Sequence, residues 1–116
     1  MDRKERVSMD IGNRIRERRI ELGMTQEELA RAAGYKSKSS INKIEVDGRG
    51  LPQDKIVDIA KALKVTPSYL MGWEDEEVAT LTAMQEETMA KFLMLDYEHQ
   101  LIVKSIVDTL TEQEKG

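Results

Sequence analysis

The sequence predicts an all-α protein, and three observations support this fold class. No stretch alternates apolar and polar residues with a period of two, as a half-buried strand would. Aromatic residues make up only 4% of the 116 residues. The core must therefore consist of Leu, Ile, Val, Ala and Met, which is normal for packed helices. The 7 Gly and 2 Pro fall between segments in which apolar residues recur every three or four positions, so we expect a string of helices.

The first predicted helix covers residues 9–22 and ends at Gly23, since glycine commonly follows the last helical turn. Ile11, Ile15 and Leu22 share one face of it. The second begins after Thr25, where Glu28 three residues later completes a capping-box pattern.

The third predicted helix follows Gly34, starts with Ser37 as its cap and extends to about Val46. Pro52 suits the first turn of a fourth helix, whose apolar stripe consists of Ile56, Ile59, Ala60 and Leu63. The pair Thr66-Pro67 is typical of a cap followed by a first-turn proline, and predicts a short fifth helix ending near residue 71.

The composition changes after residue 72. An acidic run at 74–77 suits the start of a sixth helix, because negative charge stabilises a helix N-terminus. Apolar residues then recur every three or four positions to Leu95. Asp96 is expected to cap a seventh helix, which frays from Thr111. We expect the sixth helix to fold back at residues 95–96 and cover part of the seventh.

Charge divides the chain in the same place. Residues 1–71 hold 15 Lys and Arg against 11 Asp and Glu, a net charge of +4, whereas residues 72–116 hold 3 Lys against 11 acids, a net charge of −8. A basic part can steer a polyanion even when the whole chain is acidic, here −4. The sequence therefore predicts two segments, a basic one over 8–72 and an acidic helical one over 74–112.

The second and third predicted helices, with a glycine between them, form a helix-turn-helix in outline. The third helix presents short polar and basic side chains at its N-terminal end. Such a face suits the major groove of DNA, where hydroxyls and lysines can reach base edges and phosphates.

The segments TQEELA, INKIE, IAKAL and YLMG of residues 11–72 together resemble the Cro/CI (XRE) family of phage-repressor-like transcriptional regulators. The resemblance implies a five-helix lambda-repressor-like domain that binds a double-stranded DNA operator, in a repressor that acts as a dimer on a palindromic site. It implies a backbone contact for Gln26, base reading by Lys38, Ser39 and Lys43, and an ion pair between Arg19 and Glu45. The full set expected to face DNA is Gln26, Ser37, Lys38, Ser39, Asn42, Lys43 and Arg49.

The turn departs from the family pattern. The family places the Ile of the recognition helix six residues after the turn glycine, whereas Ile41 is seven residues after Gly34. The resemblance therefore places the first residue of the recognition helix, and the residues that read bases, only to within one position.

An enzyme is the alternative from another functional class, and the sequence offers little for one. It has no Cys, no Gly-rich phosphate loop and no cluster of metal ligands, and the residues after Met71 are too few for the protease domain that larger relatives carry. We predict no catalytic residue, metal or cofactor. The absence of a signal-peptide core or an apolar run of about 18 residues predicts a cytoplasmic protein that makes no contact with a membrane.

The acidic segment is expected to form a homodimer through its helices. The seventh predicted helix places six apolar residues within ten positions, Leu101, Ile102, Val103, Ile106, Val107 and Leu110. The alternative is an antitoxin-like interaction module that also binds its own operator, with a toxin or an antirepressor as partner.

Overall fold

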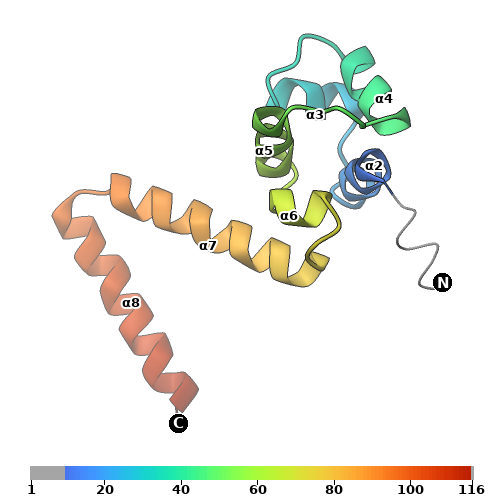
Figure 1. Ribbon diagram of the computed structural model, residues 1–116. Helices are drawn as coiled ribbons and strands as arrows, with labels where there is room; N and C mark the ends of the chain where they lie inside the picture. The colour runs from blue at the N-terminus through green and yellow to red at the C-terminus, as the bar shows by residue number, and fades with distance from the viewer. Residues whose placement is uncertain (1–9, 116) are drawn as a thin grey trace. The chain divides into compact units, whose positions relative to one another are not determined.

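The computed structural model describes residues 10–115, which form seven helices and no strand (Figure 1). The prediction of an all-α fold is confirmed. The chain divides between Met84 and Gln85 into two compact units. The first five helices are α2 (Ile11–Glu21), α3 (Gln26–Ala32), α4 (Lys38–Val46), α5 (Gln53–Ala62) and α6 (Pro67–Leu70).

Two longer helices follow. Helix α7 (Glu76–Met94) begins in the first unit and ends in the second, which also holds α8 (Tyr97–Lys115). The predicted domain limits, 8–72 and 74–112, stay a prediction. None of the helices between residues 10 and 115 has both the length and the apolar character that crossing a membrane requires.

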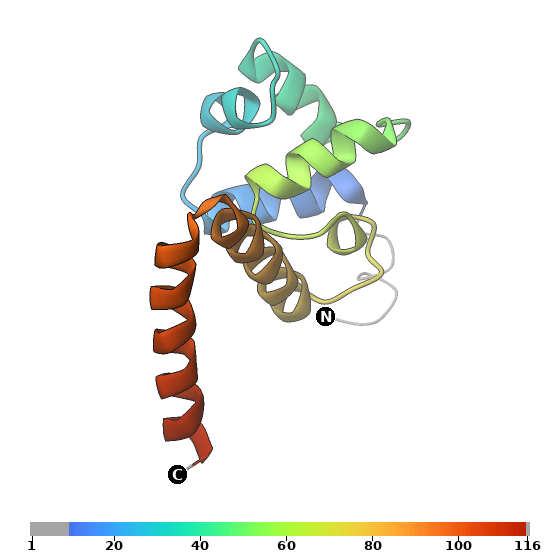
Figure 2. The same cartoon turned by 90° about the vertical axis from the view of Figure 1, so that its left-hand side faces the viewer.

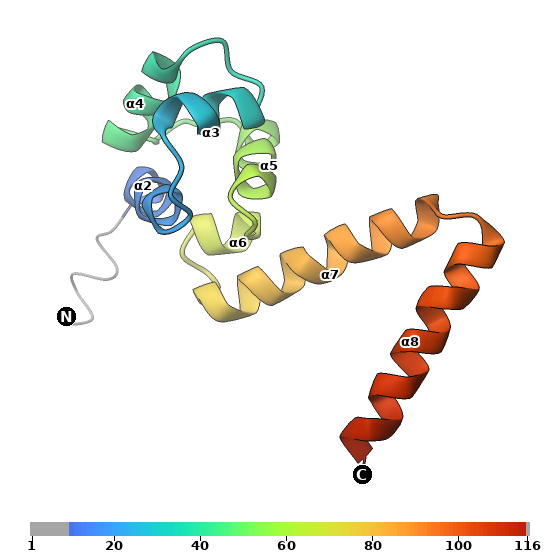
Figure 3. The same ribbon diagram turned by 180° about the vertical axis from the view of Figure 1, so that it is seen from behind.

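Helices α2 to α6 surround a common interior, as Figures 2 and 3 show from two sides. Each of these five helices supplies one fully buried apolar side chain to this interior, and the residue that follows α5 supplies another. Burial of each stabilises the fold by roughly 1.5–3 kcal/mol. These side chains are Ile15, Leu29, Ile41, Ile59, Leu63 and Leu70.

Side-chain caps explain where several helices begin. The Thr25 hydroxyl accepts from the Glu28 backbone N–H at 3.0 Å, and the Glu28 carboxylate accepts from the Thr25 N–H at 2.9 Å. This confirms the predicted capping box. Thr66 accepts from the Tyr69 N–H at 3.2 Å, and Asp96 caps α8, as predicted.

Some helix ends differ from the prediction. Residue 9, the predicted start of the first helix, lies outside the described residues. Leu22, which was expected on the buried face of the first helix, follows the last residue of α2 and is 39% exposed. Pro52 precedes the first helical residue of α5. Helix α8 continues to Lys115, where fraying was predicted from Thr111, and the Thr111 hydroxyl donates to the Val107 carbonyl at 2.7 Å.

The second unit contains the junction between α7 and α8. The side-chain amide of Gln100 donates to the carbonyls of Phe92 and Leu95, at 3.1 and 3.2 Å, and so satisfies the end of α7. No residue of α8 is buried. Among the apolar side chains of α8 only that of Val103 is partly buried, so the face that the preceding helix was expected to cover in part is largely exposed.

Candidate nucleic-acid interface

The helix-turn-helix consists of α3 and α4 with a turn over residues 33–37. Gly34 adopts a φ of +84°, in the left-handed region where a side chain would be strained. The Tyr35 N–H donates to the Ala30 carbonyl at 2.8 Å, which closes the end of α3. The extra residue of the turn is thus accommodated between two well-formed helices.

Tyr35 fixes the turn to the domain. The Lys55 ammonium lies 5.2 Å from the centre of the Tyr35 ring, within the range of a cation–π contact. The buried Tyr35 hydroxyl has no hydrogen-bond partner among the described residues. Burial, with smaller contributions from Asp58 and Asp54, raises the pKa of Tyr35, so the ring stays neutral.

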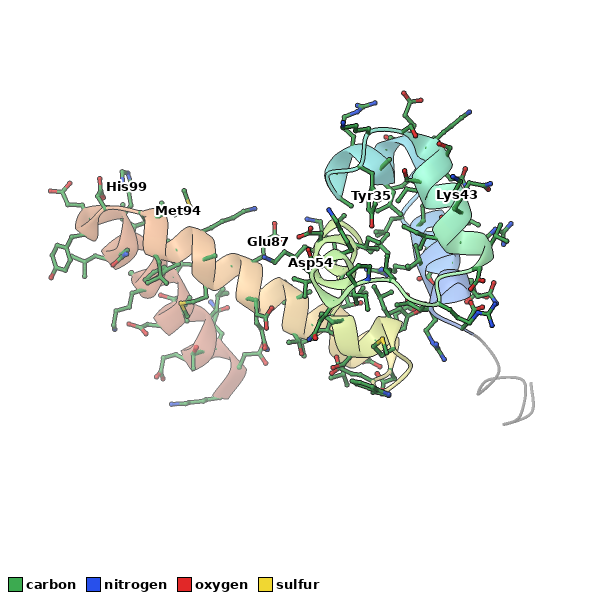
Figure 4. The ribbon with its side chains drawn as sticks, turned by 45° about the horizontal axis from the view of Figure 1, so that its top comes forward. Tyr35, Lys43, Asp54, Glu87, Met94 and His99 are labelled. Carbon is green, nitrogen blue, oxygen red and sulfur yellow. The ribbon has the colours of Figure 1, made fainter. Side chains whose placement is uncertain are left out.

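Helix α4 has one buried and one exposed face. Ile41 is fully buried and Glu45 is 5% exposed. Figure 4 shows Lys43 on the outer side of α4 and Tyr35 at the turn before the helix. The predicted contact residues on α4 are all exposed, namely Lys38, Ser39, Asn42 and Lys43.

Ser37 occupies the cap position of α4 but does not cap the helix with its side chain. Its hydroxyl lies 2.7 Å from the Ser39 hydroxyl instead. The predicted cap hydrogen bond is therefore absent, because the two neighbouring hydroxyls bond to each other. Ser37 and Ser39 are both exposed at the N-terminal end of α4.

A hydrogen-bonded network connects α2, α3 and α4. Arg19 Nε lies 2.6 Å from Glu45 Oε2, and Arg19 Nη2 donates to Glu45 Oε1 at 3.1 Å. Arg19 also donates to the Met24 carbonyl at 2.8 Å. The Gln26 amide nitrogen donates to Glu45 Oε1 at 3.0 Å and to Asn42 Oδ1 at 3.4 Å. The network thus fixes the orientation of α4 and holds the Gln26 amide.

Arg49 lies in the loop after α4. Its Nε and Nη2 each donate to a different oxygen of Asp47, both at 2.9 Å. This pairing lowers the pKa of Asp47 to about 2. An anionic ligand would therefore compete with Asp47 for Arg49.

Comparison with known proteins agrees with this geometry. The helix-turn-helix family model matches residues 15–70, from within α2 to the end of α6. Residues 15–70 of this chain form a helix-turn-helix domain of the Cro/CI type. Members of this family are DNA-binding transcription regulators. No curated protein matches the chain.

A solved structure is similar to the Cro/CI-type domain. It is the P22 c2 repressor protein in complex with the synthetic operator 9T in the presence of Tl⁺. The two chains are 28% identical, with a TM-score of 0.53. The match covers 58% of this chain and all of that one.

Arg18 is a further structural residue of the Cro/CI-type domain, which the sequence interpretation missed. It is 8% exposed, and its Nε donates to the Leu63 carbonyl at 2.9 Å. Its Nη1 lies 3.1 Å from Glu76 Oε1. A hydrogen bond with Glu76, and then burial, raise the pKa of Glu21 nearby. The spacing of Arg18 from Ile15 was a signal for its place on the buried face.

Gly12 was also missed. A Cβ atom there would lie 2.5 Å from the Ile44 carbonyl oxygen and 2.7 Å from that of Glu45. Helix α2 therefore approaches the backbone of α4 so closely that only glycine fits. A single glycine inside a helical pattern carries no sequence signal for such a contact.

Proposed function

We propose that the protein is a sequence-specific transcriptional repressor that reads a DNA operator with α4. The observation that carries the proposal is the division of α4 into two faces. Ile41 and Glu45 anchor the helix in the domain, and the opposite face presents exposed lysines and small polar groups. The likeness to a repressor solved in complex with a synthetic operator supports operator binding by this domain.

The contact residues divide by chemistry. Lys38, Ser39, Asn42 and Lys43 face the bases and neighbouring phosphates, since Lys and Asn can bond to major-groove edges. Ser37 stands at the N-terminal end of α4, where a phosphate would also meet free backbone N–H groups. Arg49 and the start of α3 at Gln26 complete the set.

We further propose that two chains bind together, with their acidic helices as the dimer contact. One small domain reaches only one half-site, whereas a dimer places two recognition helices in successive major grooves about 34 Å apart. The operator would then be palindromic. Five of the six apolar side chains that the sequence places on this helix are between 46% and 57% exposed, and Val103 is partly buried. The five are Leu101, Ile102, Ile106, Val107 and Leu110.

The same apolar face supports a second candidate function. An antitoxin-like chain would place a toxin or an antirepressor on α8 and bind its own operator with α4. A defined protein that co-purifies with the full-length chain in a fixed ratio would favour this candidate over the plain repressor.

Selection from a random duplex DNA pool tests the function. The full-length chain should enrich one palindromic sequence with two half-sites. The same DNA, placed at a promoter, should reduce transcription when the protein is present. A pool without enrichment at any position would contradict sequence-specific binding, and increased transcription would contradict repression.

A further inference from the structure

One face of α8 carries residues whose spacing is the same when the helix is read in either direction. We propose that the α8 helices of two chains pair through this face in antiparallel orientation, about a twofold axis that passes between Ile106 and Val107. The inference rests on the proposed dimer and assigns its geometry. This surface, the palindromic face, consists of His99, Val103, Ile106, Val107, Leu110 and Glu114.

The spacing places these six residues on one side of the helix. Each helical residue is rotated by about 100° from the one before it, so the six positions lie within about 100° of each other around the axis. The steps between them are four, three, one, three and four residues, an order that reversal does not change. In an antiparallel pair, Val103 therefore meets Leu110 of the partner subunit, and Ile106 meets Val107 of the partner subunit.

The apolar centre of the palindromic face is open to solvent within residues 10–115. Ile106, Val107 and Leu110 are 55%, 53% and 54% exposed, and Val103 is partly buried. Removal of such apolar surface from water is the main driving force of protein association. A second α8 is a suitable cover, because a twofold dimer brings the same surface of each chain against the other.

The distribution of charge along α8 favours antiparallel over parallel pairing. Residues 97–104 carry one acid and one lysine, whereas residues 108–115 carry three acids and one lysine, a net charge of −2. A parallel pair would place the two acidic ends side by side, and like charges held close together oppose association. An antiparallel pair places each acidic end beside the neutral end of the other helix.

The two ends of the palindromic face also differ in chemistry. Glu114 takes part in none of the ion pairs found in residues 10–115. His99 stands at the start of α8 (Figure 4). Its Nδ1 lies 2.8 Å from Asp96 Oδ1, which leaves Nε2 for a group on another chain. Antiparallel pairing brings each Glu114 to the His99 ring of the partner subunit, whereas parallel pairing would oppose two Glu114 carboxylates.

Disulfide formation between introduced cysteines tests the orientation, since the natural chain has no Cys. His99→Cys and Glu114→Cys place thiols at the two ends of the palindromic face, about 22 Å apart along the helix. A disulfide requires Cα atoms within about 7 Å of each other. Glu112→Cys is the matched control, because Glu112 is exposed near the same end of α8 but on the opposite side of the helix. Full-length chains are oxidised singly and as mixed pairs, with and without operator DNA.

We expect the mixture of His99→Cys and Glu114→Cys chains to form a linked heterodimer. The bond should form roughly a hundredfold faster than in the mixture of His99→Cys and Glu112→Cys, because pairing raises the effective thiol concentration from micromolar toward millimolar. Neither His99→Cys nor Glu114→Cys should link when it is oxidised alone. The linked heterodimer should bind the operator at least as tightly as the natural chain.

Three results would overturn the inference. Linked homodimers of His99→Cys or of Glu114→Cys alone would show parallel pairing. A dimeric chain that links equally in the test and control mixtures, or in neither, would show that another surface forms the contact. A linked heterodimer without operator affinity would show that the antiparallel pair is not the DNA-binding form.

Two further measurements separate these results from other failures. Circular dichroism of each reduced variant confirms that the helices are intact. A natural chain that enriches no DNA sequence would refute the proposed function, whichever disulfides form, so the two failures are distinguishable.

Discussion

At the scale of single residues, the exposed lysines of α4 differ from the groups that hold the helix in place. Neither Lys38 nor Lys43 takes part in any of the ion pairs found among the described residues. DNA would therefore not have to displace an acidic partner from either lysine. Arg49, in contrast, is paired with Asp47. Contact with DNA therefore has different consequences at these positions.

Replacement of Lys38 or Lys43 by Ala should weaken operator binding by about 1–3 kcal/mol if the side chain reaches a base edge. The fold should be unaffected, because both side chains are exposed. Titration of operator and of unrelated DNA measures the effect. Lys61→Ala, on α5, is the control. Equal losses on all sequences would restrict the lysine to phosphate contact.

Asp47→Asn should strengthen binding to DNA of any sequence. It frees Arg49 from its ion pair and removes a negative charge from the loop. Because the pairing lowers the pKa of Asp47 to about 2, the carboxylate is ionised throughout the neutral range and protonates only as the pH falls toward 2. The gain should therefore be the same at pH 6 and pH 8. Asp58→Asn on α5 controls for the charge alone, and an equal gain in that variant would assign the effect to net charge.

At the scale of helices, two contacts between α2 and α4 set the position of the recognition helix. One is the ion pair of Arg19 and Glu45, whose side chains are 12% and 3% exposed. The other is the approach of the two backbones at Gly12. Both should be visible in the stability of the domain.

Removal of one partner of the ion pair should destabilise the domain strongly. Arg19→Met leaves the buried Glu45 carboxylate without its cation, at a cost of about 3–5 kcal/mol. The double variant Arg19→Met/Glu45→Leu should recover much of this loss, since it leaves no buried charge. Urea denaturation of the two single variants and the double variant gives the coupling free energy. A value near zero would mean that the pair does not contribute to stability.

Gly12→Ala should destabilise the domain by about 1–3 kcal/mol, as expected when an added methyl group forces two backbones apart. The nearest atoms are backbone oxygens of α4, which cannot rotate away. Asn13→Ala, one position later and exposed, is the control and should be neutral or slightly stabilising. The midpoint of thermal unfolding measures both. Equal stability of the two variants would show that the contact relaxes without loss.

Local patterns were enough to predict most helices. Thr25, Thr66 and Asp96 cap the helices that their sequence positions suggested, because a cap depends only on residues three or four positions away. The orientation of Gln26 was beyond prediction, since it depends on side chains from three helices. Asp47 was missed because its pairing with Arg49 depends on the conformation of a loop.

The resemblance placed Arg19 and Glu45 in one pair, which periodicity alone does not identify. For a related reason, the sequence did not predict how much of the apolar face of α8 the preceding helix covers. An apolar stripe predicts that a helix needs a partner, but not which element or which chain provides it.

At the scale of the whole molecule, the apolar face of α8 is expected to control oligomeric state and operator affinity together. Ile106→Glu places a charge on this face without changing the DNA-binding domain. The natural chain should sediment as a dimer at micromolar concentration, and the variant as a monomer. The variant should lose about a hundredfold in operator affinity, because the second half-site no longer binds within the same complex.

Ser105→Glu, the preceding exposed residue of α8, is the control and should remain dimeric. A chain that ends at Met84 should also be monomeric and folded. It keeps the buried Ala79 and the Arg18–Glu76 pair, which a chain ending at Gly72 would lose. A natural chain that sediments as a monomer, or an Ile106→Glu variant with full affinity, would contradict a dimer through α8.

The pair of Asp47 and Arg49 has a further consequence for how binding responds to ionic strength. Each phosphate neutralised by a protein cation releases counterions from DNA, and the dependence of log affinity on log salt concentration steepens by about 0.9 per phosphate. Arg49 already has a counterion in the carboxylate of Asp47, which lies two residues earlier in the same chain. Contact between Arg49 and a phosphate should therefore add less to the salt dependence of DNA binding than contact by an unpaired cation. Occupancy of the operator should consequently vary less with the salt content of the surroundings than the number of basic side chains suggests.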